Sequence, residues 1–272
     1  MNYRHSFHAG NFADLVKHAF VLWLLERRQA AGPVTVIDTH AGAGVYDLTG
    51  DAARSKEAEA GIARLMAAET RPPLIEALAV EVASLNPHGG VTLYPGSPLL
   101  VSGRLRKDDR YIGFELNPPV LELLTGALEP FAQSTGRGGD GYDQAKAEAA
   151  RSSAAFVLID PPFEKPDDYL RAADTAAAIV KADPRAMVAI WTPLKDLETF
   201  DGFLRRLQQS GAQNVLVAEA RLRPLTNPMK MNGCAMVVLQ PPAGAETAAR
   251  EICGWVAETL GDSGAKAEVW TA

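Results

Sequence analysis

Short apolar runs rich in β-branched residues alternate along the chain with Ala-rich stretches of helical periodicity. This alternation predicts an α/β protein with a largely parallel sheet. Because the runs are almost continuously apolar, the strands that they form should be buried on both faces. The last two runs follow each other around a loop, and we expect them to pair as an antiparallel hairpin at one edge of the sheet. The runs are 34–37, 111–114, 155–159, 187–191, 214–218 and 235–239.

Two helices can be expected next to these strands. Residues 11–31 carry apolar side chains at helical spacing, and Gly32-Pro33 ends the pattern. A second helix should begin at Ser97-Pro98, with Ser97 as the N-cap and the proline at the first helical position.

The interval between the first two strands is much longer than a strand–helix–strand crossover requires. Within it, residues 54–69 and 74–86 both show helical patterns. We therefore expect an inserted helical subdomain at 46–93, and a main domain formed by 1–45 and 94–272.

The composition is that of an ordinary globular protein of 272 residues, 47% of them hydrophobic and 22% charged. A net charge of −6 argues against a general nucleic-acid binder, which usually carries a basic surface. Three basic clusters could still contact a phosphate backbone, although such clusters are more often solvated surface. They lie in the first 18 residues, at 104–110, and at Arg221, Arg223 and Lys230.

The sequence favours a cytoplasmic location. No apolar run approaches the ~20 residues needed to span a bilayer, and the first eight residues lack the apolar stretch of a signal peptide. Cys234 and Cys253 have no metal-ligand spacing, so we expect neither a disulfide framework nor a metal site.

Small and acidic residues follow three of the expected strands. Residues 38–44 after the first strand contain two glycines that would let the backbone approach a ligand. They do not form the dinucleotide fingerprint, because Asp47 stands where its third glycine would be. Glu115 ends the second strand, where an acid commonly binds two ribose hydroxyls. Residues 134–138 make a poor third strand, but Asp140-Gly141 after them could meet an adenine amino group. An ordinary turn explains Asp140 equally well, and Glu115 alone would be an ordinary strand-end carboxylate.

The most specific chemical signal is Asp160-Pro161-Pro162-Phe163, which follows the apolar run at 155–159. The prolines fix φ twice and lack N–H donors, so the Pro161 carbonyl is a free acceptor in a rigid turn. This carbonyl and the Asp160 carboxylate could accept hydrogen bonds from both N–H groups of a planar exocyclic amino group. These bonds would direct the nitrogen lone pair at an electrophilic methyl carbon. Phe163 offers a ring on which a base could stack. The alternative is a turn that only ends the strand.

The glycine loop, the strand-end acids and the Asp-Pro-Pro-Phe loop occur in an order that resembles the class I S-adenosylmethionine-dependent amino-methyltransferases. Residues 3–11, Asp14, Lys17-His18 and 94–98 are similar to the RlmJ family in particular, and the similarity runs from about residue 2 to 242. The resemblance implies a Rossmann-like fold with a mostly parallel, seven-stranded sheet and an antiparallel edge. It also implies S-adenosyl-L-methionine as methyl donor and adenine N6 of 23S ribosomal RNA as target.

The resemblance assigns roles to individual residues. Asp160 with Pro161 and Phe163 would hold the target base, and Tyr3 would face the RNA in an N-terminal segment that orders over cofactor and base. Phe163 stands where many family members have Tyr, which keeps the stacking and loses a hydroxyl. Taken alone, His18 on its predicted helix would more often be a packed group than a ligand contact. The implied cofactor contacts are His18, His40, Gly42, Ser97, Glu115, Asp140 and Gly141.

Three functions remain open. The first, which the resemblance implies, is an RNA adenine-N6 methyltransferase acting on 23S rRNA that is free of most ribosomal proteins, as a monomer without metal or membrane. The second is a DNA adenine-N6 or protein amide methyltransferase, because the same loop suits any planar amino nitrogen. The third is a non-enzymatic nucleic-acid uptake or binding factor, for which Asp160→Ala would be silent.

Overall fold

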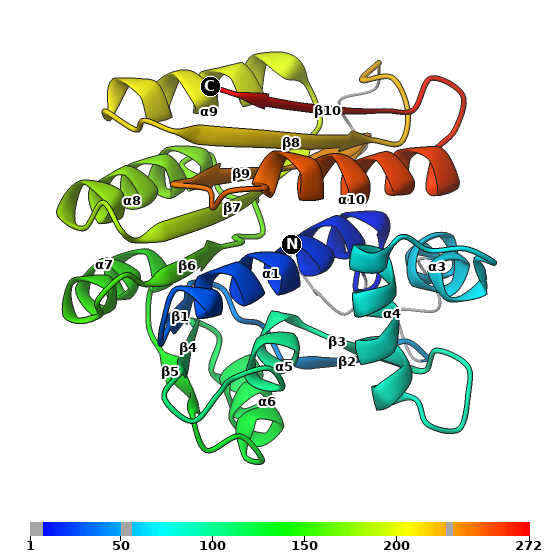
Figure 1. Ribbon diagram of the computed structural model, residues 1–272, viewed down its shortest axis with the longest axis horizontal. Helices are drawn as coiled ribbons and strands as arrows, with labels where there is room; N and C mark the ends of the chain where they lie inside the picture. The colour runs from blue at the N-terminus through cyan, green and yellow to red at the C-terminus, as the bar shows by residue number, and fades with distance from the viewer. Residues whose placement is uncertain (1–7, 50–55, 227–230) are drawn as a thin grey trace.

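The computed structural model describes residues 8–49, 56–226 and 231–272, and an eight-stranded sheet forms its centre (Figure 1). Helices cover both faces of the sheet, so the expected α/β architecture is confirmed. The strands are β1 (Thr35–Asp38), β4 (Arg110–Glu115), β5 (Ser134–Gly138), β6 (Phe156–Ile159), β7 (Met187–Leu194), β8 (Val215–Arg221), β9 (Gly233–Leu239) and β10 (Lys266–Thr271).

The sheet has a parallel and an antiparallel half. Its strand order is β10-β8-β9-β7-β6-β1-β4-β5. Five neighbouring strands, β7, β6, β1, β4 and β5, run parallel to one another. In contrast, β9 runs antiparallel to both β7 and β8. The parallel strands therefore all end at one edge of the sheet, which is where ligands bind in open α/β folds.

Two expectations about the sheet are corrected. It has eight strands rather than seven, because Lys266–Thr271 adds β10 at the edge. Only Val269 of this strand is buried, so the sequence lacks the continuous apolar run of an internal strand. The β8–β9 hairpin is antiparallel as expected, but it does not form the edge, since β10 pairs with β8. The glycine-rich segment Ser134–Gly138 does form a strand, β5, at the opposite edge.

The helices contribute to two apolar cores, one on each face of the sheet. Side chains of α1, α4 and α10 join one core, and side chains of α7, α8 and α9 join the other (Figure 1). Among the described residues, no helix combines the length and the apolar composition of a membrane span. The helices are α1 (Phe12–Ala30), a π-helix (Glu59–Ala63), α3 (Arg64–Ala67), α4 (Pro73–Leu85), α5 (Ser97–Ser102), α6 (Pro118–Leu128), α7 (Gly141–Arg151), α8 (Asp168–Ala182), α9 (Leu197–Gln209) and α10 (Ala245–Leu260).

Helix α1 begins and ends where the sequence predicts. The Asn11 side chain caps it by accepting hydrogen bonds from the N–H groups of Ala13 and Asp14. The helix is buried around most of its circumference in its first half, including the polar residues Lys17 and His18. Because buried polar groups need partners, these two side chains indicate a polar site beneath the helix.

The insertion between β1 and α5 is flanked by a small antiparallel sheet of β2 (Val45–Asp47) and β3 (Leu93–Pro95). The helix expected at 54–69 is in the structure a π-helix followed by α3, and residues 54 and 55 lie outside the described ranges. Ile62 and Leu78 belong to the same apolar core as α1, so the insertion packs against the main domain. Its delimitation as a separate subdomain at 46–93 stays a prediction.

Candidate active site

The carboxyl ends of β1, β4, β5 and β6 meet at one edge of the sheet, and the predicted polar residues follow them directly. Gly42 lies in the loop after β1, and its N–H donates to Glu115 Oε2 at the end of β4, over 3.2 Å. Gly42 has φ = +66°, and a Cβ at this position would clash with the Tyr46 hydroxyl. The loop therefore requires glycine here, and it presents backbone rather than side chain beside Glu115.

Ser97 does not cap α5 as expected, because the N-cap is Gly96. Its hydroxyl instead donates to Asp38 Oδ2 over 2.6 Å, and the Tyr111 hydroxyl donates to the same oxygen over 3.1 Å. Asp38 is fully buried, and burial raises the pKa of its carboxyl to about 6 even though these hydrogen bonds lower it. The sequence interpretation missed Asp38, although an acid at the end of an apolar strand was the available signal.

Of the two histidines implied as cofactor contacts, His18 is buried and His40 is half-buried, and both already have partners. His18 Nδ1 lies 2.8 Å from the Tyr94 hydroxyl. His40 Nδ1 lies 2.7 Å from the Thr39 hydroxyl, and its ring meets Tyr142 edge to face at 4.8 Å. Burial lowers the pKa of His40 to about 4, so the ring is neutral at pH 7.

Asp140 and Gly141 begin α7. The Asp140 side chain accepts from the N–H of Tyr142 over 3.1 Å, as an N-cap does. Gly141 has no room for a side chain, because a Cβ would overlap the Thr39 carbonyl of the β1 loop. Asp140 also pairs with Arg171 of α8, a residue that the sequence interpretation did not identify.

Asp160 follows β6 and is held by a buried lysine. Lys17 Nζ lies 2.6 Å from Asp160 Oδ2 and 2.8 Å from Asp14 Oδ1. Burial opposes the charge of Lys17, but the charges of Asp14 and Asp160 raise its pKa well above the usual value. Lys17 was recognised only as part of a motif, and its contact with Asp160 joins residues 143 positions apart.

Phe163, the residue expected to stack on the base, is largely buried. The residue is 7% exposed, and its ring packs against Tyr169 at 4.5 Å and Trp191 at 6.0 Å between centroids. Its backbone has φ = +49°, which is unfavourable for a residue with a side chain and is found mainly where surrounding structure imposes it. Tyr3, the expected RNA contact, lies outside the described residues.

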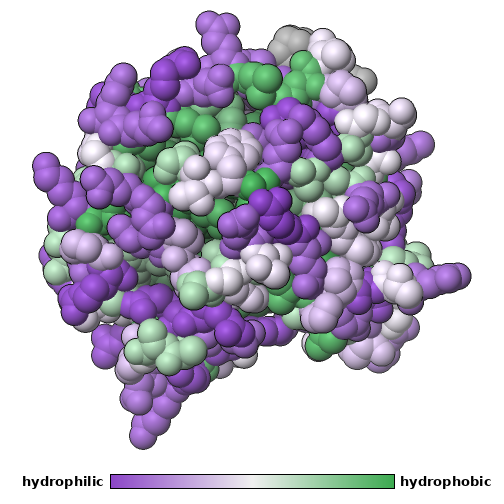
Figure 2. All heavy atoms as spheres, turned by 45° about the horizontal axis from the view of Figure 1, so that its top comes forward, coloured by the Kyte–Doolittle hydropathy of each residue, from purple (hydrophilic) through white to green (hydrophobic). Residues whose placement is uncertain are grey.

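The expected basic clusters are largely neutralised by acidic neighbours. Arg104 pairs with Glu81, and Arg106 pairs with Asp109. In the third cluster, Arg221 pairs with Glu219 and Glu268, and Arg223 pairs with Asp262. Figure 2 shows hydrophilic side chains spread over the face that it draws rather than gathered in one area. Lys230 lies outside the described residues.

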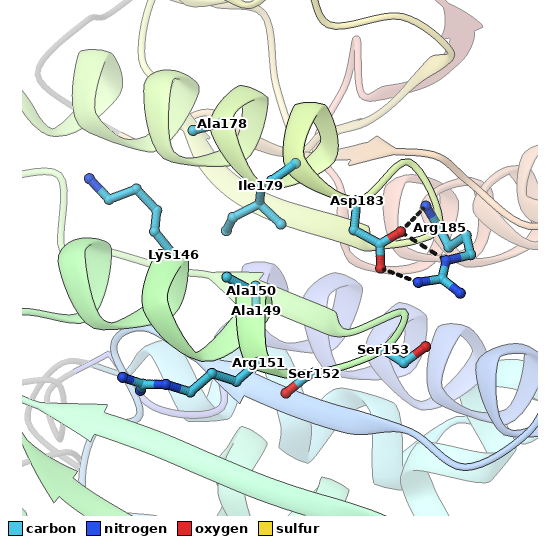
Figure 3. Close-up of a pocket in the computed structure, with 11 residues that line it drawn as sticks. Lys146, Ala149, Ala150, Arg151, Ser152, Ser153, Ala178, Ile179, Asp183 and Arg185 are labelled. Carbon is cyan, nitrogen blue, oxygen red and sulfur yellow. Dashed lines mark hydrogen bonds and ion pairs between the residues drawn. The ribbon is translucent and has the colours of Figure 1, made fainter.

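A cavity of about 510 Å³ lies between the C-terminal parts of α7 and α8 (Figure 3). It is lined by Lys146, Arg151, Ser152 and Asp183, among others, and Asp183 binds Arg185 there. These helix ends precede β6 and β7, so the cavity is at the opposite edge of the sheet from Asp160. None of the sequence-predicted site residues lines it.

Comparisons with known proteins identify the family of this chain. The model of the family described as ribosomal RNA large subunit methyltransferase D, RlmJ, matches residues 31–272. The ribosomal RNA large subunit methyltransferase J of Escherichia coli is 32% identical, over 97% of this chain and 95% of that protein. The protein of the same name from Haemophilus influenzae is also 32% identical, over 96% and 94%. A solved structure, protein LPL1258 of Legionella pneumophila, shares the fold with a TM-score of 0.86 at 23% identity, over 97% of this chain and 98% of that one. The chain belongs to the RlmJ family of ribosomal RNA large subunit methyltransferases.

Proposed function

We propose that this enzyme transfers a methyl group from S-adenosyl-L-methionine to the exocyclic N6 of an adenine in 23S ribosomal RNA. The observation that carries the proposal is the buried contact between Lys17 and Asp160 at the start of the Asp-Pro-Pro-Phe loop. The contact fixes one oxygen of a carboxylate at the strand ends. An immobile acceptor is what the orientation of an amino nucleophile requires.

The residues at the strand ends fit the cofactor. Glu115 would accept from the ribose hydroxyls, and the Gly42 backbone offers close approach without a side chain. Asp140 would accept from the adenine amino group, beside the N-terminus of α7. His18, His40, Ser97 and Gly141 would complete the binding site. When bound, S-adenosylmethionine supplies an electrophilic methyl group.

The chain's own contribution to the reaction is orientation. Lys17 occupies Asp160 Oδ2, and within the described part of the chain no hydrogen bond reaches Oδ1. Oδ1 and the Pro161 carbonyl would accept hydrogen bonds from the two N6–H groups and direct the nitrogen lone pair toward the methyl carbon. Phe163 would stack on the base, with Tyr169 and Trp191 behind it. The N-terminal segment with Tyr3 would close over both ligands and exclude water.

The substrate assignment rests on the family rather than on the catalytic loop. The resemblance of residues 3–11 and 94–98 favours RNA, whereas the Asp-Pro-Pro-Phe loop alone suits any planar amino nitrogen. The proposed partner is 23S rRNA before most ribosomal proteins bind, and the proposed form is a cytoplasmic monomer. Sequence-specific RNA recognition generally uses splayed-out bases, which agrees with a target base that leaves its stack.

The experiment that tests the proposal is incubation with labelled S-adenosylmethionine and 23S RNA, 16S RNA or DNA, followed by digestion to nucleosides. We expect N6-methyladenosine from 23S RNA alone. Methylation of DNA or protein would show that the substrate is not 23S RNA, while the methyl-transfer reaction would stand. Absence of any labelled product, with cofactor binding intact, would favour a binding factor instead of an enzyme.

A further inference from the structure

Arg171 makes a compact set of contacts at the mouth of the proposed cofactor site. Its Nη2 lies 2.9 Å from Asp140 Oδ1 and 2.8 Å from Oδ2. The guanidinium also lies over the ring of Tyr142, with its carbon 4.4 Å from the ring centroid. Arg171 comes from α8, whereas Asp140 and Tyr142 come from the first turn of α7, so the contacts join two helices at this edge of the sheet.

The local chain fixes the Asp140 carboxylate only in part. Asp140 stands between Gly139, which has φ = +146°, and Gly141. Its own turn provides the cap hydrogen bond from Tyr142 N to Oδ1 and a second backbone hydrogen bond from Asp143. Arg171 is the group that binds both oxygens and thereby determines the orientation of the carboxylate plane.

Tyr142, the ring on which Arg171 stacks, is itself held in place from two sides. It directs its hydroxyl to the Asp168 carbonyl over 3.4 Å, one turn before Arg171 on α8. On its other side, the Tyr142 ring packs edge to face against His40 of the β1 loop. The arginine therefore connects α8, the first turn of α7 and the β1 loop in one packed unit.

The Asp140 carboxylate stays partly open to a ligand. Oδ1 accepts from Tyr142 N and Arg171 Nη2, Oδ2 accepts from Arg171 Nη2, and the backbone N–H of Asp143 also donates to the carboxylate. Side-chain exposures of 36% for Asp140 and 28% for Arg171 show that the pair remains accessible from outside. A ligand amino group can therefore reach the carboxylate without displacing the arginine.

We propose that Arg171 is a positioning residue for cofactor selection, which orients Asp140 so that its partly exposed carboxylate distinguishes an amino group from a carbonyl at C6 of the cofactor's purine. This inference rests on the proposed function, because it takes S-adenosylmethionine as the ligand. Arg171 acts through Asp140 and not on the transferred methyl group. Removing the Arg171 guanidinium weakens binding of the cofactor's adenine and reduces the preference for an amino group. It does not change the orientation of the RNA base at Asp160.

The test compares the dissociation constants of S-adenosylhomocysteine and S-inosylhomocysteine by calorimetry, for the full-length protein and its variants. We expect the unmodified protein to prefer the adenosyl ligand by at least about tenfold, because the inosyl carbonyl would face a carboxylate. In Arg171→Met we expect the adenosyl ligand to bind about tenfold more weakly and the preference to fall to about twofold. Arg171→Lys keeps one charged donor and should restore part of the preference.

Arg206→Met is the matched control, because Arg206 of α9 binds both oxygens of Asp174 of α8 at 2.7 and 2.8 Å. It should leave both dissociation constants unchanged. An unaltered preference in Arg171→Met, with the fold intact by circular dichroism, would overturn the inference and leave the proposed function standing. Tighter adenosyl binding in that variant would overturn it too, since Arg171 would then be a competitor for Asp140. If the unmodified protein binds neither ligand, the proposed function fails as well.

Discussion

Two carboxylates at the same edge of the sheet are held by a cation from a nearby helix, but in different surroundings. Asp160 and Lys17 have side-chain exposures of 10% and 4%, whereas Asp140 and Arg171 have exposures of 36% and 28%. Water can replace a lost partner at the second pair and has little access to the first. The buried pair therefore fixes the geometry where the chemistry is proposed, and the half-exposed pair adjusts recognition of a ligand that enters and leaves.

The buried pair is most strongly tested by Lys17→Met. The substitution leaves the carboxylates of Asp14 and Asp160 next to each other without a cation. We expect the free energy of unfolding to fall by about 3–5 kcal/mol, measured in urea, and methyl transfer to be lost. Lys195→Met removes an exposed lysine and is the control. A loss below about 1 kcal/mol would place this pair in the same class as a surface ion pair.

Asp160→Ala separates the chemistry from stability. Lys17 keeps Asp14 as its partner, so the fold should survive. We expect the rate of methyl transfer to fall by at least about a hundredfold, because the amino nitrogen is no longer oriented. The dissociation constant for S-adenosylhomocysteine should change little. If calorimetry showed instead that the ligand no longer binds to the folded variant, Asp160 would be a cofactor-binding residue and not the group that orients the base.

Asp38 is a third acid at a strand end. It differs from Asp160 and Asp140 because hydroxyl groups rather than a cation bind its side chain. Burial raises its pKa to about 6, from a usual value of 3.8. The folded state then holds a proton that the unfolded state releases, so this residue makes stability fall as pH rises from about 4 to about 6. Above that window the cost is roughly 2–3 kcal/mol. Below the window both states are protonated and the residue contributes nothing.

Asp38→Asn removes this proton linkage. In the variant, the free energy of unfolding should no longer contain the decrease that Asp38 causes between pH 4 and 6. The stability of the variant relative to the unmodified protein should therefore increase over this range. Urea titrations at pH 4, 5, 6 and 7 measure it. His40 contributes in the opposite direction, since burial lowers its pKa to about 4 and stability rises as pH passes from about 4 to 6.5. A constant difference between the two proteins would show that Asp38 stays ionised throughout.

The parts of the site that the sequence predicts are those defined by short-range pattern. Apolar runs locate the strands, and the residues directly after them reach the same edge because parallel strands end together. The contact of Lys17 with Asp160 could not be predicted in this way, since it requires α1 to pack over the end of β6. The burial of Phe163 likewise depends on Tyr169 of α8, and β10 was missed because an edge strand needs no apolar run.

The smallest effect on stability is expected for Arg171→Met. The pair with Asp140 is partly exposed, so water solvates the carboxylate when the guanidinium is removed. We expect the free energy of unfolding to change by no more than about 1 kcal/mol in urea, and the effect to shrink with added salt because exposed charges are screened. The same variant should show its main effect in ligand preference, which is the reverse of Lys17→Met. A stability loss as large as that of Lys17→Met would show that Arg171 is a structural support for α7, and the distinction between the two carboxylates would then disappear.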